Sequence, residues 1–367
     1  MTDNNTLGQF DSSHPISNGV EPNQNPEIPE FNLQPDVSVP QAEQKLLAMP
    51  ASYSRILIGS GFLAISIFSG MALITAYLPS FPDTPAEVQV AAAQAVEEAR
   101  VYDGLQLSAK GAYVFDASND HVLFKRNPET QLPLASITKV ALALVAAEAL
   151  PMESNVTISR SAVEKGGGGL TSGEKWRVRD LLDYMLIASS NTAAEALTEA
   201  AEPIMHDRYP EAPAGGAVIW RMNALARQLG LKATYFINPS GLDESLTQAG
   251  ALGSAQDIAT LFSYALRTNR DLFAGTSRTH ATLGALNMPK RDVHNTNEAL
   301  ESIPHIYMGK TGLTDLAGGN LAIAFDAGEN HPVIIVVLGS TPEGRFTDME
   351  KLVSASMQLI GTSTPAR

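Results

Sequence analysis

One uncharged run of the sequence, from Ile56 to Leu78, most constrains how this chain is organised. It holds no Asp, Glu, Lys or Arg over 23 residues. At about 1.5 Å per residue, a helix of that length crosses a hydrocarbon core of roughly 30 Å. We therefore predict a transmembrane helix at residues 56–78. A cleaved signal peptide would begin near residue 1 and have a shorter apolar core, so this helix is expected to remain as an anchor.

The basic residues on either side of this run predict its orientation. Lys45 and Arg55 precede it, whereas the first basic residue after it is Arg100. Positively charged flanks stay in the cytoplasm, so residues 1–55 are predicted to be cytoplasmic and the remainder to lie outside the cytoplasmic membrane. The chain is thus expected to be a single-pass protein of that membrane.

The segments around the predicted span differ sharply in composition. Residues 1–55 are rich in Asn, Gln, Pro and Ser with little apolar periodicity, which is typical of a disordered tail. Residues 79–104 begin with a proline-punctuated linker, and Ala86 to Arg100 are predicted to form a short helix. Residues 105–362 then form the predicted globular domain.

Charge and cysteine content exclude several classes of function. The formal net charge is −14, whereas binding to duplex nucleic acid depends on Lys and Arg neutralising phosphates. We therefore expect no nucleic-acid partner. The chain has no cysteine, which excludes disulfides, zinc sites with thiolate ligands and thiol catalysis.

Alternating hydrophobic patterns predict an α/β domain whose sheet is formed by both ends of the domain sequence. The helices predicted between these ends would make a largely helical middle. Helix patterns cover Ile137 to Leu150, Val178 to Ala201 and Val218 to Leu229. Strand patterns cover Gly111 to Asp116, His121 to Lys125, Tyr307 to Gly312, Asn320 to Phe325 and Val333 to Leu338.

The first candidate for chemistry is Ser136 with Lys139, at the start of a helix that is apolar on every face. Residues three apart share a helical face, so the amine can reach the hydroxyl. A buried lysine disfavours its ammonium form and can serve as a base for serine. The spacing alone is weak, because Ser172 and Lys175 repeat it; that second pair follows four glycines and is interpreted as a polar loop.

Two further motifs strengthen this hypothesis. Ser189-Ser190-Asn191 follows a predicted helix; it fits an ordinary helix cap, or a second hydroxyl for proton relay with an amide that holds a substrate peptide group. Lys310-Thr311-Gly312 fits an ordinary strand end, or a cation and hydroxyl placed for a substrate carboxylate beside a glycine that allows close approach. A second ammonium nearby would further favour a neutral Lys139.

The three motifs, in this order, are the signature of penicillin-binding proteins and class A β-lactamases. From about Gly111 to Leu352 the sequence resembles the low-molecular-mass D-alanyl-D-alanine carboxypeptidases of the S11 serine peptidases. Other stretches that carry the resemblance are Asp180-Leu181-Leu182, Met222-Asn223, Leu229-Gly230-Leu231, Asn238-Pro239-Ser240-Gly241-Leu242, Ala255-Gln256-Asp257-Ile258-Ala259, Ala317-Gly318, Val337-Leu338-Gly339-Ser340 and Arg345-Phe346 with Asp348.

The resemblance implies a β-lactamase/transpeptidase-like fold, with an antiparallel five-stranded sheet flanked by helices and an all-helical subdomain. It implies hydrolysis of peptidoglycan stem peptides at D-Ala-D-Ala and inhibition by β-lactams, without a cofactor. It further implies Ser136 as nucleophile and Lys139 as its base. Ser189 and Asn191 would serve the leaving group and the peptide.

On the substrate side, the resemblance implies that Lys310 and Thr311, with Gly312 beside them, bind the terminal carboxylate. The backbone N–H groups of Ser136 and Leu313 would form the oxyanion hole. The sequence departs from many relatives at Ser190, where Gly is common, and at Leu313, where aromatic residues or His are frequent. It also ends at Arg367, without room for the β-rich C-terminal domain and amphipathic tail of many carboxypeptidases; we expect the N-terminal span to replace that tail.

Three alternatives remain open from the sequence. A D,D-endopeptidase would cleave a chemically similar bond in cross-links. A class A-like β-lactamase would need a glutamate poised for deacylation, and Glu195, Glu199 and Glu202 lie on a predicted helix instead of a loop. A catalytically inactive wall-binding scaffold would keep the fold without the reaction.

The histidines predict no metal site, because none of them shows metal-ligand spacing. The segment His294-Asn295-Thr296-Asn297 is predicted to lie near the active site. The other histidines considered are His121, His206, His280, His305 and His331.

Overall fold

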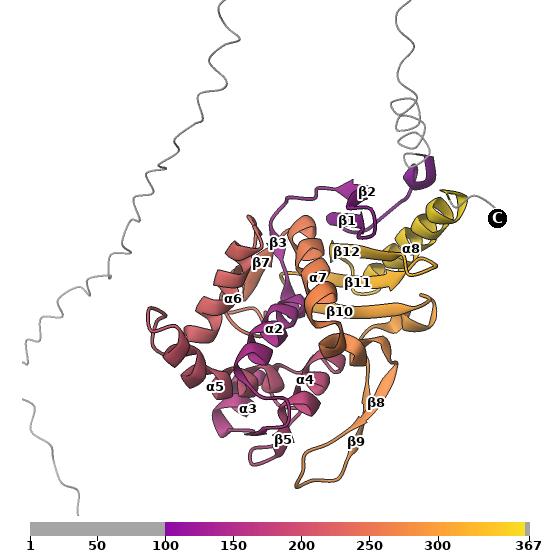
Figure 1. The fold of residues 1–367 in the computed structure, drawn as a ribbon. Helices are drawn as coiled ribbons and strands as arrows, with labels where there is room; N and C mark the ends of the chain where they lie inside the picture. Colours follow the sequence, from indigo (N-terminus) through magenta and orange to yellow (C-terminus); the bar gives the residue numbers. More distant parts are fainter. Residues whose placement is uncertain (1–99, 364–367) are drawn as a thin grey trace, which may run out of the picture. The chain divides into compact units, whose positions relative to one another are not determined.

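The computed structural model describes residues 100–363, in which both ends of the domain sequence meet in one antiparallel five-stranded sheet (Figure 1). The strand order is β10-β11-β12-β1-β2. All five predicted sheet strands are present, with bounds Gly111–Asp116 (β1), His121–Arg126 (β2), Ile306–Thr314 (β10), Gly318–Asp326 (β11) and Pro332–Ser340 (β12). The sheet therefore confirms the predicted pairing of the two ends.

Both faces of this sheet are buried, which explains why its central strands are almost continuously apolar. Successive side chains of a strand point to opposite faces. On β12, Ile334 and Val336 pack into the larger core, and Ile335 and Val337 pack into the smaller one. Helix α7 (Ala255–Asn269) covers the first face, and α8 (Gly344–Ser363) covers the second (Figure 1).

The remaining helices form a second, largely helical part beside the sheet, which also contains a short pair of strands at 155–157 and 175–177. At its centre, α2 (Lys139–Ala149) has nearly every residue buried, so it can hold side chains away from water. Around it pack α4, α5, α6 and α7. The bounds of the other helices are Arg160–Gly166 (α3), Val178–Ile187 (α4), Asn191–Arg208 (α5) and Ala217–Gln228 (α6).

Two of the predicted helices differ from those observed. The helix predicted over 178–201 is two helices, because Ser189 takes a left-handed backbone (φ 58°) and Ser190 caps the second helix by accepting from Ala193 N at 3.2 Å. The second helix also continues past Ala201, through Pro203. The helix predicted over 137–150 begins as a 3₁₀ turn, η1 (Ala135–Thr138), and becomes α-helical at Lys139.

The short elements that complete the fold were not predicted. Two 3₁₀ helices are η2 (Arg270–Ser277) and η3 (Glu298–Glu301). The remaining strands are Leu132–Pro133 (β3), Asn155–Thr157 (β4), Lys175–Arg177 (β5), Tyr235–Phe236 (β6), Ala251–Gly253 (β7), His280–Leu283 (β8) and Arg291–His294 (β9). They form a three-stranded sheet β3-β7-β6 and the pairs β4-β5 and β8-β9.

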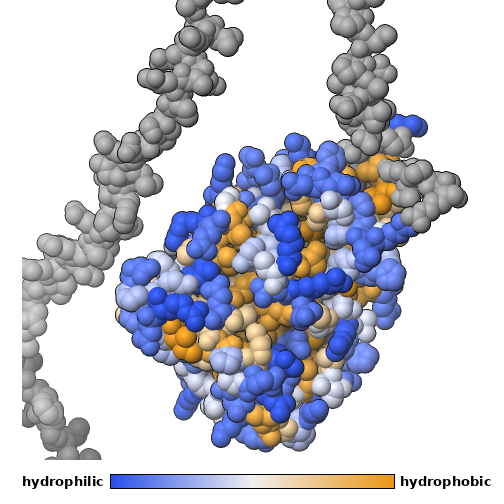
Figure 2. Space-filling view, in the orientation of Figure 1, coloured by the Kyte–Doolittle hydropathy of each residue, from blue (hydrophilic) through white to orange (hydrophobic). Residues whose placement is uncertain are grey.

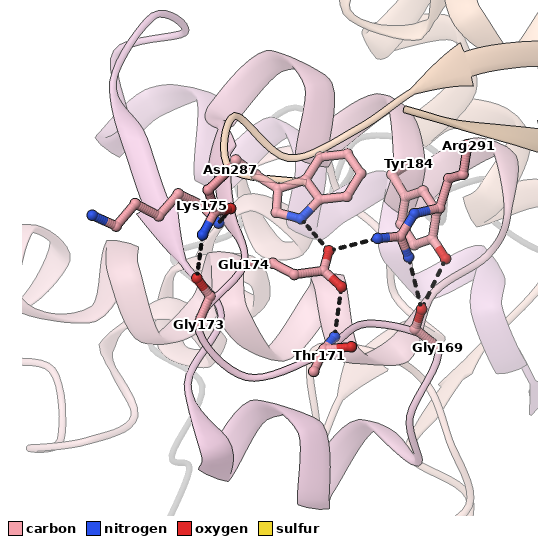
Figure 3. Close-up of polar contacts among 9 residues, drawn as sticks. Gly169, Thr171, Gly173, Glu174, Lys175, Tyr184, Asn287 and Arg291 are labelled. Carbon is pink, nitrogen blue, oxygen red and sulfur yellow. Dashed lines mark hydrogen bonds and ion pairs between the residues drawn. The ribbon is translucent and has the colours of Figure 1, made fainter. Parts of the chain in front are cut away.

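A buried carboxylate joins the turn before β5 to the β8-β9 hairpin (Figure 3). Glu174 accepts from Thr171 N (2.8 Å), Trp176 Nε1 (2.9 Å) and Arg291 Nη2 (2.9 Å). Burial raises the pKa of this carboxyl, but the three hydrogen bonds outweigh burial and hold the pKa below its usual value. In the second Ser-x-x-Lys pair, Ser172 thus lies in a turn, in line with the predicted loop, whereas Lys175 begins β5; Glu174 between them is a structural anchor.

The predicted tail (1–55), the predicted transmembrane helix (56–78) and most of the predicted linker (79–99) lie outside the described residues. The description begins with residues 100–104, the end of that linker. Residues 100–102 are helical. Between residues 100 and 363, no helix has both the length and the apolar character needed to cross a membrane.

Candidate active site

The hydroxyl of Ser136 lies on the 3₁₀ turn η1, which β10 and β11 hold in place. Asn320, on β11, donates from Nδ2 to the carbonyls of Pro133 (2.9 Å) and Leu134 (3.0 Å). A Cβ on Gly312 would lie 2.8 Å from Leu134 O, so only glycine lets β10 approach this turn so closely. Backbone strain is concentrated here, because Ala135 has a left-handed backbone (φ 48°).

Lys139 is fully buried and its amine meets three oxygen atoms. Its Nζ lies 2.7 Å from Ser136 Oγ, 2.7 Å from Asn191 Oδ1 and 2.8 Å from Ser240 O. Burial lowers the pKa of this amine to about 7, and the nearby charge of Glu195 opposes the lowering. Near neutral pH, Lys139 can therefore exist as a free amine and accept the proton of Ser136.

The turn between α4 and α5 presents Ser189 and Asn191 to two different amines. Ser189 Oγ accepts from Lys310 Nζ at 2.8 Å. Asn191 begins α5, and its Oδ1 faces Lys139. The left-handed conformation of Ser189 breaks the helix at the point where both side chains can face the site.

Lys310 and Thr311 lie on the edge strand β10, and both are buried. Lys310 Nζ also donates to Thr311 O (2.9 Å) and Thr311 Oγ1 (3.4 Å). Burial lowers the pKa of Lys310 well below its usual value, and repulsion from Lys139 and Arg345 lowers it further. The site therefore holds two buried amines, each bound to a serine hydroxyl.

Three further residues contact the site: Ser240 and Arg345, to which the sequence assigned no role, and Thr296, from the segment predicted to lie near it. Ser240 supplies its carbonyl to Lys139. Thr296 Oγ1 lies 2.5 Å from Thr311 Oγ1, so two hydroxyl groups stand at one place. Arg345 Nη1 donates to Gly312 O at 2.9 Å and fixes the strand behind the motif. The sequence signal for each was its place in a family-like stretch or beside His294.

Two of the predicted positions lie at the margin of this arrangement. Leu313 follows directly on β10 and is 49% exposed. Figure 2 shows that hydrophobic and hydrophilic residues are mixed on the face of the domain in view. His294 is exposed on β9, opposite His280, and the neighbouring Thr296 makes the contact with Thr311. The structure thus brings together Ser136, Lys139, Ser189, Asn191, Lys310, Thr311 and Gly312. No group of three His, Asp or Glu side chains among the described residues could hold a metal ion.

Comparison with known proteins gives consistent matches. Residues 93–342 match the family model described as D-alanyl-D-alanine carboxypeptidase. The chain is 30% identical over 253 residues to D-alanyl-D-alanine carboxypeptidase DacF of Bacillus subtilis, which covers 67% of this chain and 61% of that protein. It is also 30% identical over 251 residues to a D-alanyl-D-alanine endopeptidase of Pseudomonas aeruginosa, covering 66% of this chain and 74% of that one.

Solved structures give the same picture. Penicillin-binding protein D2 of Listeria monocytogenes, in its ampicillin-bound form, superimposes with a TM-score of 0.57 and 29% sequence identity. The match covers 69% of this chain and 98% of that structure.

Proposed function

The chain belongs to the D-alanyl-D-alanine carboxypeptidase family, and from this premise we propose that it removes the terminal D-alanine of peptidoglycan stem peptides through an acyl-enzyme on Ser136. The observation that carries the proposal is the buried amine of Lys139, 2.7 Å from the Ser136 hydroxyl and with a pKa of about 7. Such a pair is an activated serine nucleophile.

In the proposed acylation step, Lys139 Nζ takes the proton of Ser136 Oγ, and Oγ bonds to the carbonyl carbon of the penultimate D-alanine. The backbone N–H groups of Ser136 and Leu313 would stabilise the oxyanion. The C–N bond then breaks, and the departing amine takes the proton of Ser189, whose Oγ is reprotonated by the ammonium of Lys310, 2.8 Å away. Terminal D-alanine leaves.

The terminal carboxylate would be bound by Lys310, Thr311 and the adjoining Thr296. Buried hydrogen-bond donors are worth more to an anion than exposed ones, because little water competes for it. The hydroxyl oxygens of Thr311 and Thr296 are 2.5 Å apart, so one carboxylate can accept hydrogen bonds from both hydroxyls. Asn191 would orient the peptide group. Water then attacks the ester; one of its protons passes to Lys310, and Lys139 returns its proton to Ser136 Oγ as the ester bond breaks.

β-Lactams are expected to acylate Ser136 in the same way, since the related Listeria protein has been solved in an ampicillin-bound form. The test is labelling with a fluorescent penicillin beside release of free D-alanine from a stem pentapeptide. The wild-type chain should take the label and release D-alanine, and Ser136→Ala should do neither. Absence of both signals from the folded wild type would instead favour a wall-binding scaffold.

A second candidate within the same chemistry is D,D-endopeptidase action on cross-linked peptides. The Pseudomonas relative named an endopeptidase is as similar to this chain as the Bacillus carboxypeptidase is. Incubation with purified cross-linked muropeptides separates the two activities, because an endopeptidase lowers the cross-linked fraction without releasing D-alanine. Rapid turnover of nitrocefin would support the β-lactamase alternative.

We further propose that the domain acts outside the cytoplasmic membrane, held by the uncharged run at 56–78 with the N-terminus in the cytoplasm. The proposal rests on that run and on Lys45 and Arg55 before it. Protease added to intact spheroplasts should digest residues 105–362 and spare an epitope at the N-terminus. Protection of the domain until lysis would refute this orientation.

A further inference from the structure

Helix α5 carries an acidic neighbour of the active-site amine of Lys139. Asn191 and Glu195 are four residues apart on this helix, so they lie on the same face, one turn from each other. Asn191 Oδ1 touches Lys139 Nζ at 2.7 Å. Glu195, which is half-buried, therefore lies on the same face of α5 as the contact with Lys139, one turn further along the helix.

Charged groups of several elements surround this carboxylate. Lys139 of α2 and Lys165 of α3 supply positive charge, whereas Glu199 of α5 and Glu244, in the loop that follows Ser240, supply negative charge. Burial, the largest influence, raises the pKa of Glu195. In return, its charge opposes the effect of burial on Lys139.

The neighbouring acids already have partners. Glu199 accepts from Ser159 Oγ, and Glu244 accepts from Asn238 Nδ2 at 2.6 Å. Among the residues from 100 to 363, Glu195 has neither a hydrogen-bond partner nor an ion-pair partner. Its half-buried charge is therefore not neutralised by a structural contact, and its main electrostatic effect falls on the cations near it.

We propose that Glu195 is a positioning residue that stabilises the ammonium form of Lys139 when Ser136 transfers its proton. In acylation, Lys139 changes from a neutral amine to a cation inside a dry site. A fixed negative charge nearby lowers the free energy of that cation and makes the amine a stronger base. The inference rests on the proposed function, because it concerns the same proton transfer.

The experiment is the pH dependence of Ser136 acylation by a fluorescent penicillin in wild type, Glu195→Gln and Glu202→Gln, between about pH 5 and pH 9. Removing the charge at Glu195 lowers the pKa of Lys139, so more of the amine is neutral at low pH. The acid limb of the profile of acylation rate against pH should therefore move to lower pH, by about half a pH unit to one pH unit. Glu202 lies on the same helix but binds Ala217 N (2.6 Å) and Val218 N (3.1 Å), so its variant should keep the wild-type limb.

Two results would overturn the inference. One is a Glu195→Gln limb that coincides with that of wild type, and the other is an equal shift in Glu202→Gln. Circular dichroism checks folding; should Glu195→Gln not fold, Glu195→Asp must move the limb in the same direction by less, and an unmoved limb there also overturns it. A wild-type chain that takes no label at any pH would refute the proposed function itself, so the two failures are distinguishable.

Discussion

Gly241 offers a direct test of how the loop after β6 supports the nucleophile. Its backbone is left-handed (φ 75°), and the adjacent Ser240 gives its carbonyl to Lys139. A Cβ built on Gly241 would lie 1.9 Å from Ala135 O and 2.4 Å from Thr138 Oγ1. Both neighbours belong to the turn that carries Ser136, so Gly241→Ala must push the loop and this turn apart.

The magnitude follows from two separate contributions. A left-handed backbone costs a residue with a Cβ about 1–2 kcal/mol, and overpacking against a rigid backbone adds about 1–3 kcal/mol. Gly230, at the end of α6, isolates the first contribution, because it is also left-handed (φ 70°) but has nothing within 4 Å of a built Cβ. We expect Gly230→Ala to lose about 1 kcal/mol of unfolding free energy and Gly241→Ala about 3 kcal/mol.

Urea denaturation followed by circular dichroism measures both losses, and fluorescent penicillin labelling measures acylation of the folded fraction. Gly230→Ala should acylate at the wild-type rate. Gly241→Ala should acylate at least about tenfold more slowly, because a contact of Lys139 is displaced by a fraction of an ångström or more. If both variants lost equal stability and acylated equally fast, the close approach of Gly241 to Ala135 would carry no energetic weight and the reasoning would be refuted.

Three further outcomes follow from the buried ionisable groups. The acylation rate should rise with pH through about 7, since only the neutral form of Lys139 accepts a proton; a rate independent of pH between 6 and 8 would contradict its role as base. Asp183 has a pKa raised to about 6, mainly by burial, so its ionised form is disfavoured in the fold; Asp183→Asn should therefore be about 1–2 kcal/mol more stable than wild type at pH 8, an advantage that disappears in urea titrations as the pH falls toward 4. The lowered pKa of Glu174 means that its ionised form stabilises the fold at pH values above 4.5, the ordinary pKa of a glutamate. Glu174→Gln should therefore lose about 2–4 kcal/mol of unfolding free energy at pH 7, and its difference from wild type should shrink as the pH falls. An unchanged urea midpoint at pH 7 would show that water replaces the contact of Glu174 with Arg291 at no cost.

The sheet was predictable because its physical signal is local and strong. β-Branched residues run through Val333 to Leu338, and such runs mark strands that are buried on both faces. The break in the helix predicted over 178–201 was less accessible. Ser189 is left-handed directly after the C-cap of α4, a position where glycine usually marks the end of a helix; a serine there carries no such signal in a hydrophobic pattern.

Most of the site residues could be predicted from the three motifs, because the residue types and their spacing within each motif had a chemical meaning. The spacing of Ser240 had no such chemical meaning, and Thr296 was predicted only to lie near the active site, without a role. Ser240 contributes a backbone carbonyl, which any residue type could supply, and Thr296 gains its contact with Thr311 from the path of the chain between β9 and η3. Such roles depend on tertiary placement, so the identity of the residue carries little of the signal.

The two buried amines explain why the arrangement suits repeated proton transfer. Burial lowers the pKa of both Lys139 and Lys310, and repulsion between them opposes the state in which both are charged. Near neutral pH the pair therefore holds fewer than two protons, which leaves one position able to receive the proton of Ser136. Ser136 lies at one amine and Ser189 at the other, at 2.7 and 2.8 Å. A proton gained from the nucleophile and a proton given to the leaving amine can thus cancel within one catalytic cycle, so the buried site never has to hold an extra charge that the surrounding protein cannot solvate.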